Sequence, residues 1–387
     1  MIDTRKTSGI MGIISFLCFA TIPLNSLQIG GASIYKYLFI GIIAITALVF
    51  LYMSGTVRIQ KAELFWVVYV LYGSIVSVFS ENGTGLSYAI GMLQLCAMCV
   101  LLLQFKDYSR KTVLAGFFIC SAVMIYMLLV LSTEQRHTDR NMIKFGELGK
   151  IDPNEWCACL IVPLAACTYY AFKAKHLWKR VVLIGLAAFA FYTILLTGSR
   201  GGLLSNAVVV LIVAMRAMRA SWKTMITVPV LVALAAFAFF KWILPNVSQT
   251  LMDRFTLDAV VETGGTGRTD IWERTVETIL SDPIRMIFGR GFYGAKVDTC
   301  SHNQLLQVLL DSGIIGFTLY ILMLRNIYKR AKANGEIASA SFWGVQVALL
   351  TLSAYAYFKM VWMIYLFCLM QFRKEDKTKI SEPVGAN

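Results

Sequence analysis

The chain has 387 residues, of which 58% are hydrophobic and only 15% are charged, and its formal net charge is +14. A soluble domain of this size would have about a quarter of its residues charged, so the composition excludes a soluble protein. Because the basic residues form short clusters beside apolar runs, the positive charge does not indicate nucleic-acid binding either.

Apolar runs of the length that spans a bilayer as a helix follow one another along the chain. The first run follows Arg5 and Lys6 and lacks a small-residue cleavage site, so we expect a retained helix rather than a signal peptide. The last apolar stretch forms either two short spans around Lys359 or one broken span. We predict an all-α polytopic membrane protein with about twelve transmembrane helices, or as few as ten. They are expected at residues 10–29, 35–54, 64–80, 86–104, 112–131, 156–172, 181–198, 201–215, 224–243, 304–324, 340–357 and 360–372.

The distribution of charge predicts the orientation of these helices. If the N-terminus is cytoplasmic, 22 of the 36 Lys and Arg residues fall on the cytoplasmic side and 15 of the 22 acidic residues fall on the outer side. An excess of Lys and Arg in cytoplasmic loops is the rule for membrane proteins. We therefore expect both termini in the cytoplasm and one large, partly helical loop outside.

The predicted spans contain few residues that are suited to catalysis or ion transport. Most have no ionisable residue in their middle third, which argues against an ion-coupled transporter. Eight of the nine cysteines lie in apolar runs, and only Cys300 lies in a polar loop. Cys96 and Cys99 have a CxxC spacing without a histidine or a second pair nearby, so we expect packing roles, no disulfide framework and no metal site.

The polar segments of the outer side begin with a loop at residues 132–155, which ends in Asp152-Pro153-Asn154-Glu155. Asp-Pro-Asn predicts a turn followed by the start of a helix, and an acidic residue suits the first turn. The simplest interpretation of these residues is a helix cap.

The second outer segment is Thr197-Gly198-Ser199-Arg200-Gly201-Gly202, between the seventh and eighth spans. Ser199 can cap the eighth helix, and Gly201 and Gly202 can let a ligand reach backbone N–H groups. A helix N-terminus beside an arginine suits a phosphate group. The alternative is an arginine that reaches the membrane interface beside a tight turn.

The third segment is the long outer loop at residues 244–302, which is expected to be partly folded. Residues 267–281 have the apolar spacing of an amphipathic helix, and Asp282-Pro283 ends it. Arg268 opens this helix beside Gly267, and Arg290 stands between two glycines. Like Arg200, these arginines suit bidentate pairing with phosphate.

His302 and Asn303 stand where this loop meets the tenth span. A histidine there suits a general base near neutral pH, although a capping or hydrogen-bonding role is the simpler alternative. Asp311, nine positions later, is out of phase with His302 on a helix and is a poor candidate to orient its ring. Gly313 and Gly316 indicate close helix packing.

At these residues the chain resembles the O-antigen ligase and polymerase superfamily, bacterial membrane enzymes that join or transfer lipid-linked glycans. The family's His-Asn, nine residues, Gly-x-x-Gly pattern matches His302-Asn303 and Gly313-Ile314-Ile315-Gly316, and its Arg-x-x-x-Leu pattern matches Arg200 to Leu204. Gly267-Arg268…Trp272 and Asp152-Pro153-Asn154 are also typical, whereas Asp311 stands where the family more often has Glu. The resemblance is concentrated in a core at 181–324 of a single polytopic domain, 1–387.

The resemblance implies a metal-independent glycosyltransferase without a cofactor, with its site on the outer face of the bacterial plasma membrane. The donor would be a glycan on undecaprenyl diphosphate, and the acceptor a glycan or a lipid-anchored molecule. Membrane lipids and other polysaccharide assembly proteins are the further expected partners. Arg200 and Arg268, with Arg290, would hold the diphosphate, and His302 would remove or position the acceptor's proton. Supporting roles would fall to Ser199, Gly201, Gly202, Asn303, Gly313 and Gly316.

Polymerase and ligase activities differ only in the acceptor, and the sequence leaves both open, with a polymerase of surface or capsular polysaccharide favoured. A flippase or exporter of the same lipid-linked glycan is the main alternative. It would be expected to bury charges along a central path and to show repeated halves, and the sequence shows neither feature. A non-catalytic scaffold of glycan assembly is the third possibility, and it would tolerate the loss of His302.

Overall fold

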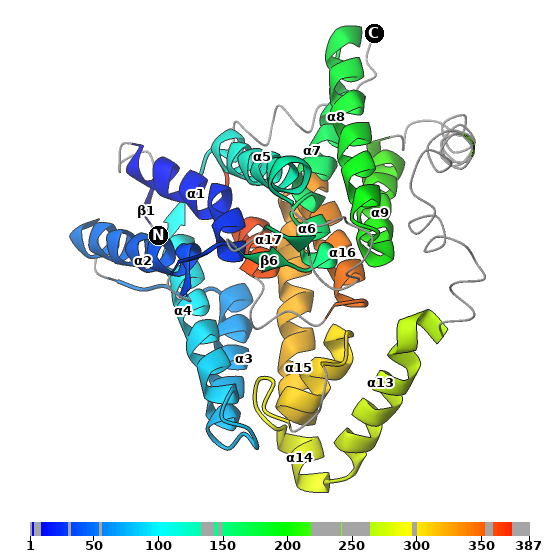
Figure 1. The fold of residues 1–387 in the computed structure, drawn as a ribbon. Helices are drawn as coiled ribbons and strands as arrows, with labels where there is room; N and C mark the ends of the chain where they lie inside the picture. Colours follow the sequence, from blue (N-terminus) through cyan, green and yellow to red (C-terminus); the bar gives the residue numbers. More distant parts are fainter. Residues whose placement is uncertain are drawn as a thin grey trace.

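The computed structural model describes residues 2–3, 9–29, 32–53, 56–132, 143–145, 149–217, 241, 264–295, 300–352 and 359–373. Within these residues the protein is mostly helical (Figure 1). The sheet is confined to three pairs of two-residue strands. They are β1 (Ile2–Asp3) parallel to β4 (Phe105–Lys106), β2 (Gln28–Ile29) antiparallel to β3 (Ala32–Ser33), and β5 (Ile143–Lys144) antiparallel to β6 (Lys150–Ile151).

Seven helical stretches of the described residues are long and apolar enough to cross a membrane. Three of them match the predicted second to fourth spans closely, and two others each join two consecutive elements. They are α2 (Ile34–Met53), α3 (Lys61–Val78), α4 (Gly85–Leu103), α5 (Arg110–Tyr126) with the π-helical turn η3 (Met127–Leu131), α6 (Pro153–Ala158) with α7 (Ile161–Lys173), α8 (Leu177–Leu196) and α15 (Gln304–Ala333).

The predicted count of about twelve spans is therefore not confirmed. Helices do form at most of the other predicted positions, but they are shorter or less apolar. The predicted span at 224–243, apart from Lys241, and residues 244–263 of the external loop lie outside the described residues. The shorter or less apolar helices are α1 (Ile10–Ala20), which the 3₁₀ turn η2 (Ile22–Ser26) follows, α9 (Arg200–Ala217), α16 (Glu336–Leu349) and α17 (Lys359–Leu369).

Two predicted spans differ from the structure in shape. The span at 156–172 is interrupted around Cys159, between α6 and α7. The span at 304–324 continues to Ala333 as α15, which is kinked where Gly313 takes a φ of 61° and a ψ of −171°. Thirty helical residues are about 45 Å long at 1.5 Å per residue, so α15 extends beyond an average bilayer core.

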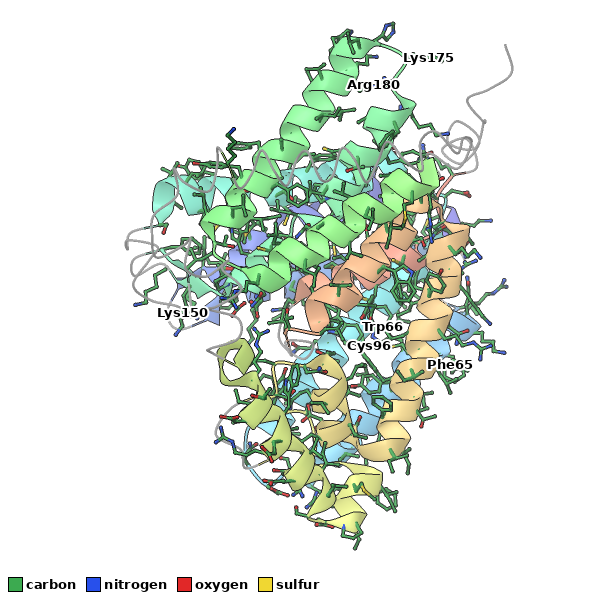
Figure 2. All side chains as sticks on the ribbon, turned by 90° about the vertical axis from the view of Figure 1, so that its right-hand side faces the viewer. Phe65, Trp66, Cys96, Lys150, Lys175 and Arg180 are labelled. Carbon is green, nitrogen blue, oxygen red and sulfur yellow. The ribbon has the colours of Figure 1, made fainter. Side chains whose placement is uncertain are left out.

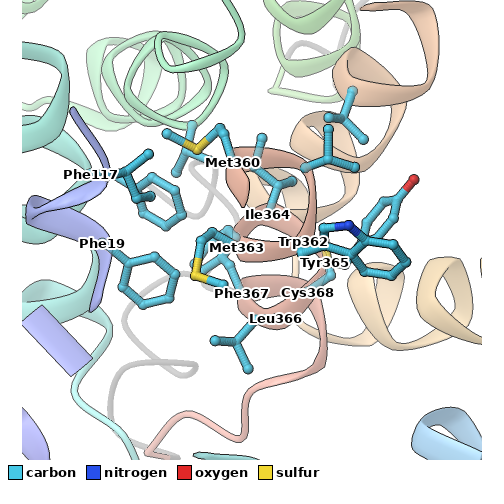
Figure 3. Close-up of a cluster of buried hydrophobic side chains, with 14 of the residues drawn as sticks. Phe19, Phe117, Met360, Trp362, Met363, Ile364, Tyr365, Leu366, Phe367 and Cys368 are labelled. Carbon is cyan, nitrogen blue, oxygen red and sulfur yellow. The ribbon is translucent and has the colours of Figure 1, made fainter. Parts of the chain in front are cut away.

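The centre of the molecule is built around α17. Every residue from Met360 to Leu369 is buried, and Figure 3 shows these side chains on all sides of the helix. A helix that is hydrophobic all round belongs inside a bundle. The ring of Trp362 stacks on Trp66 of α3 at 5.0 Å, and Phe367 meets Phe117 of α5 edge to face at 5.6 Å.

Charged residues predicted on opposite sides of the membrane lie apart in the structure. Lys175 and Arg180, which were expected in the cytoplasm, lie together at one tip of α8. Figure 2 shows Lys150, which was expected outside, far from that tip. The loops that hold the candidate functional residues are thus separated from this basic tip by the length of α8.

The external loop forms two of the helices that position the candidate site. These are α13 (Gly264–Leu280) and α14 (Pro283–Phe288), and both pack against α15 (Figure 1). The amphipathic helix predicted at 267–281 is therefore confirmed. Asp282-Pro283 not only ends α13 but also begins α14, since the Asp282 carboxylate accepts hydrogen bonds from the N–H groups of Ile284 and Arg285.

Candidate active site

The first half of the site is the N-terminus of α9. Gly198 turns the chain with a φ of 66°, which a residue without Cβ adopts easily. The Ser199 hydroxyl then accepts a hydrogen bond of 2.9 Å from the N–H of Gly202, which is the predicted cap. Arg200 is the first residue of the helix, so its side chain leaves from the end where the helix dipole is positive.

The Asp-Pro-Asn segment joins this end of α9. The Asp152 carboxylate accepts hydrogen bonds from the N–H groups of Asn154 (2.7 Å) and Glu155 (3.4 Å), which confirms a helix cap. The side chain of Asn154 also hydrogen-bonds to the Asp152 carboxylate, and its Oδ1 accepts a hydrogen bond of 2.6 Å from the Ser199 hydroxyl. Two sequence motifs 45 residues apart therefore form one structure.

The two glycines after Arg200 lie against other parts of the protein. A Cβ at Gly201 would collide with Thr351, and a Cβ at Gly202 would collide with Cys157. The absence of a side chain at these positions therefore lets α9 approach α6 and the end of α16 closely.

The second half of the site is the turn before α15. His302 has a φ of 49°, in the left-handed region that few residues with a side chain adopt. Asn303 caps α15, since its Oδ1 accepts hydrogen bonds from the N–H groups of Leu305 (3.0 Å) and Leu306 (3.3 Å). Cap and turn together fix where the imidazole leaves the backbone.

Buried polar side chains support the turn that contains His302. The N–H of Ser301 donates to Gln307 Oε1 at 3.0 Å, and Gln307 Nε2 donates to Asp311 Oδ1 at 2.9 Å. Ser301, Gln307 and Asp311 are each no more than 1% exposed. Asp311 therefore supports the backbone beside His302 through Gln307, although its spacing had made it a poor candidate to orient the ring.

Helix α13 is tied to the same turn. The indole Nε1 of Trp272 donates a hydrogen bond of 2.9 Å to the carbonyl oxygen of Ser301. Arg268 lies four residues before Trp272, one helical turn or about 6 Å along the axis. The bond thus holds the start of α13, and with it Arg268, next to His302.

The charges of these segments act on one another. Burial lowers the pKa of Arg268, the carboxylate of Asp152 raises it, and the positive charge of Arg200 lowers it. The charge of His302 in turn acts on Asp152, and the charges of Arg268 and Asp152 act on His302. Asp152, Arg200, Arg268 and His302, from four separate parts of the chain, form what we call the charge cluster.

The environment of His302 favours its protonated form. Hydrogen bonding to Cys300, whose Sγ is 3.9 Å from both ring nitrogens, raises the pKa of His302 above its ordinary value. Burial of the ring and the charge of Arg268 lower this pKa, and the carboxylate of Asp152 raises it. The net effect is a raised pKa for His302, and an imidazole is the side chain that best suits proton transfer near neutral pH.

Arg290 does not belong to the charge cluster, contrary to the sequence-based expectation. Its guanidinium forms an ion pair with Glu81, in the loop between α3 and α4, and donates to the carbonyl oxygen of Thr278 at 2.9 Å. Only 7% of Arg290 is exposed. These contacts occupy its donors and neutralise its charge, so Arg290 fastens the external loop to the bundle instead of serving a diphosphate.

Gly313 and Gly316 act in packing, as expected. A Cβ at Gly313 would strike the backbone of Ile287, and one at Gly316 would strike Ser312 of the preceding turn. Gly289, at the end of α14, fits in the same way against Asp311 and Ser312. Helix α14 therefore packs directly against the kink of α15.

Comparisons with known proteins agree with the motifs. Residues 185–321 match the O-antigen ligase family. This match supports the resemblance of the chain to the superfamily of O-antigen ligases and polymerases. The matched segment contains Arg200, Arg268 and His302, whereas Asp152 lies outside it.

The other comparisons add little about function. No curated protein matches the chain. One solved structure, entitled "Structural coordination of polymerization and crosslinking by a peptidoglycan synthase complex", is 18% identical, with a TM-score of 0.47. The alignment covers 79% of this chain and 96% of the other. This likeness is too remote for a functional argument.

Sequence reasoning missed three contributors to the site. Asp152 had been expected as a helix cap and Trp272 on the apolar face of a helix, both in segments typical of the family, and Cys300 had been noted only as the one cysteine in a polar loop. The signal for Cys300 was present, since it is the one cysteine in a polar loop and lies two residues before His302. The roles of Asp152 and Trp272 depend on partners that are remote in the sequence.

Proposed function

We propose that the protein is a membrane glycosyltransferase that extends or transfers glycans from a polyprenyl-diphosphate donor, with undecaprenyl diphosphate as the lipid carrier. The site would lie on the outer face of the bacterial plasma membrane, with both termini in the cytoplasm. The observation that carries this proposal is the charge cluster, in which two arginines and one histidine interact electrostatically. It supports a reaction in which a dianionic group leaves while a hydroxyl group loses a proton.

The diphosphate fits the two arginines. Arg200 and Arg268 repel each other, and the positive charge of Arg200 lowers the pKa of Arg268. A diphosphate between them would relieve this repulsion and accept bidentate hydrogen bonds from both guanidinium groups. Since negative charge on the diphosphate grows as its bond to the sugar breaks, the same contacts would stabilise the transition state.

His302 fits the other half of the reaction. The acceptor hydroxyl would donate its proton to the imidazole, while its oxygen attacks the anomeric carbon of the donor sugar. The bond between this carbon and the diphosphate oxygen breaks in line, and the diphosphate leaves with the electron pair. The anomeric centre would be inverted, and the proton would remain on His302 until solvent removes it.

We favour a polymerase of surface or capsular polysaccharide over a ligase, although the two differ only in the acceptor. A flippase or a scaffold is the rival from another class. The charge cluster favours the enzyme, because neither rival needs two arginines and a titratable histidine to meet at one point.

The test is a gel of surface and lipid-linked glycans from a host that lacks the gene. The host would be complemented with the wild type, His302→Ala, Arg200→Ala or Arg268→Ala at equal membrane expression. Loss of a general base costs about 10²- to 10⁴-fold in rate, and loss of a transition-state donor about 10²- to 10³-fold. We therefore expect no ladder from the three variants.

Matched controls are available within the chain. His176→Ala removes an exposed histidine at the other end of α8, Arg274→Ala removes an exposed arginine from α13, and Arg216→Ala removes the arginine at the far end of α9. These three should retain the ladder. Single repeats in the site variants indicate a polymerase, whereas long glycan that stays on its lipid indicates a ligase. A wild-type pattern in all site variants would overturn the proposal in favour of a transporter or scaffold.

A further inference from the structure

A buried glutamine stands at the start of α15, beside the turn that contains His302. Gln304 is the first residue of this helix, and only 1% of it is exposed. Within the described part of the chain, neither Oε1 nor Nε2 of its amide has a hydrogen-bond partner. Removal of an amide from water is unfavourable unless new hydrogen bonds replace those that are lost. The position of this amide therefore has a cost that the fold alone does not explain.

Two other buried glutamines show how an amide with a structural role is bonded in this protein. Gln104 and Gln307 are also 1% exposed. The Oε1 of Gln104 accepts a hydrogen bond of 2.8 Å from the N–H of Arg58, and its Nε2 donates to a backbone carbonyl of α4 at 2.9 Å. Both polar atoms of Gln307 are used in the support of the turn before α15. Gln304 differs from both, although it is buried to the same extent.

The place of Gln304 on α15 directs its side chain toward the candidate site. Side chains of an α-helix tilt toward its N-terminus and cover the preceding turn. For the first residue of α15, the preceding turn is formed by residues 301–303 and contains His302. Gln307 is three positions later on the same face, and its amide already reaches back to the N–H of Ser301. Gln304 starts about 4.5 Å closer to the end of the helix, so its amide lies beside the same turn.

An amide with an unpaired donor and an unpaired acceptor suits a carbohydrate. Neighbouring hydroxyl groups of a sugar ring can bind it together, since one accepts from Nε2 while the other donates to Oε1. A lipid tail offers neither group, and a diphosphate offers acceptors only, which would leave Oε1 unpaired. A few convergent polar groups of this kind usually fix the orientation of a bound ligand.

We propose that Gln304 is a binding residue for the substrate glycan: its amide hydrogen-bonds to two neighbouring hydroxyl groups of a sugar beside His302. This inference rests on the proposed function. The flexible side-chain torsions of glutamine let the amide turn toward the sugar without a movement of α15. Hydroxyl groups that do not react are bound equally in the ground state and in the transition state, so Gln304 contributes to affinity and sugar preference and not to the chemical step.

The test combines stability and kinetics in Gln304→Met, which replaces the amide by a flexible apolar side chain of similar length. Thermal unfolding of the purified protein should show a raised Tm, because an unpaired buried polar group has been removed. The kinetics are measured with the lipid-linked repeat unit extracted from the host that lacks the gene. We expect KM to rise by about 10-fold, which corresponds to the loss of one or two neutral hydrogen bonds. The kcat should stay unchanged, the pattern of a lost ground-state contact.

Gln104→Met is the matched control, because it makes the same change at a buried amide whose partners lie outside the candidate site. It should lower the Tm and leave the KM of the folded protein unchanged. A lowered Tm in Gln304→Met would show that its amide serves the fold and would overturn the inference, as would a wild-type KM. A reduced kcat at a wild-type KM would also overturn it, since Gln304 would then position His302 and not the sugar.

His302→Ala separates this inference from the proposed function. If His302→Ala retains full activity, the proposed function fails, whatever the KM of Gln304→Met. If His302→Ala is inactive while Gln304→Met has the KM of the wild type, only the role of Gln304 fails.

Discussion

Trp272 Nε1 donates a hydrogen bond of 2.9 Å to the carbonyl oxygen of Ser301, and this bond joins the external helix α13 to the turn that bears His302. Trp272 is half-buried, and Ser301 is 1% exposed. The bond spans 29 residues of sequence and holds Arg268, the arginine proposed to bind phosphate, near the proposed base. The two halves of the proposed reaction thus depend on one indole.

Removal of this bond should therefore loosen the site more than the fold. Trp272→Phe keeps an aromatic ring but loses the N–H donor, so we expect stability to fall by only about 1 kcal/mol. Glycan transfer should fall by about 10-fold or more, because Arg268 and His302 lose their fixed separation. The measurements are thermal unfolding of the purified protein and the rate of glycan transfer. An unaltered rate of glycan transfer would show that this hydrogen bond is not needed to position α13.

Cys300 should control the pH dependence of the reaction. Hydrogen bonding to Cys300 is the largest cause of the raised pKa of His302. Cys300→Ala should therefore lower this pKa, so the ring stays neutral to lower pH. If His302 is a general base, which must be neutral to act, the acid limb of the pH profile moves to lower pH. Cys167→Ala, which changes a buried cysteine of α7, is the control and should leave the profile in place. A shift to higher pH would contradict the assigned direction.

Arg290 and Glu81 should act in stability and not in donor binding. Loss of one partner of a largely buried ion pair costs about 3 kcal/mol, and Arg290→Ala and Glu81→Ala should each destabilise the protein by a similar amount. The double variant should be little worse than either single one, because each single change already breaks the pair. For the folded fraction, the KM for the lipid-linked donor should be unchanged, whereas Arg268→Ala should raise it. A raised KM in Arg290→Ala would instead indicate that Arg290 binds the diphosphate.

The kink of α15 should be intolerant of side chains. Gly313 has a φ of 61°, and a Cβ there would meet the backbone of Ile287. Gly313→Ala should therefore displace α14 from α15. It should lower the free energy of unfolding by at least about 2 kcal/mol, from backbone strain and overpacking together. Thermal unfolding is the measurement. Gly185→Ala, in α8 where a Cβ meets open space, is the control and should have little effect. Equal stability of both variants would contradict a packing role for the kink.

The sequence alone determined much of this protein, because many of its features are local. The length of an apolar run decides whether a helix can cross a bilayer, and the residues at a helix start decide its cap. The membrane class, the helix of the external loop and the caps at Asp152 and Ser199 could all be inferred in this way. The motifs around Arg200 and His302 also indicated the family.

Only the tertiary structure decided which of the candidate residues act together. Arg268 and Arg290 both stand beside glycines in one loop. Arg290 nevertheless pairs with Glu81, 209 positions earlier, whereas Arg268 interacts electrostatically with Asp152 and Arg200. Likewise, Gly201 and Gly202 face Thr351 and Cys157, which no local pattern predicts. The reason is physical: a charge or a missing side chain acquires its role from the atoms that packing places beside it, and packing is set by the whole chain.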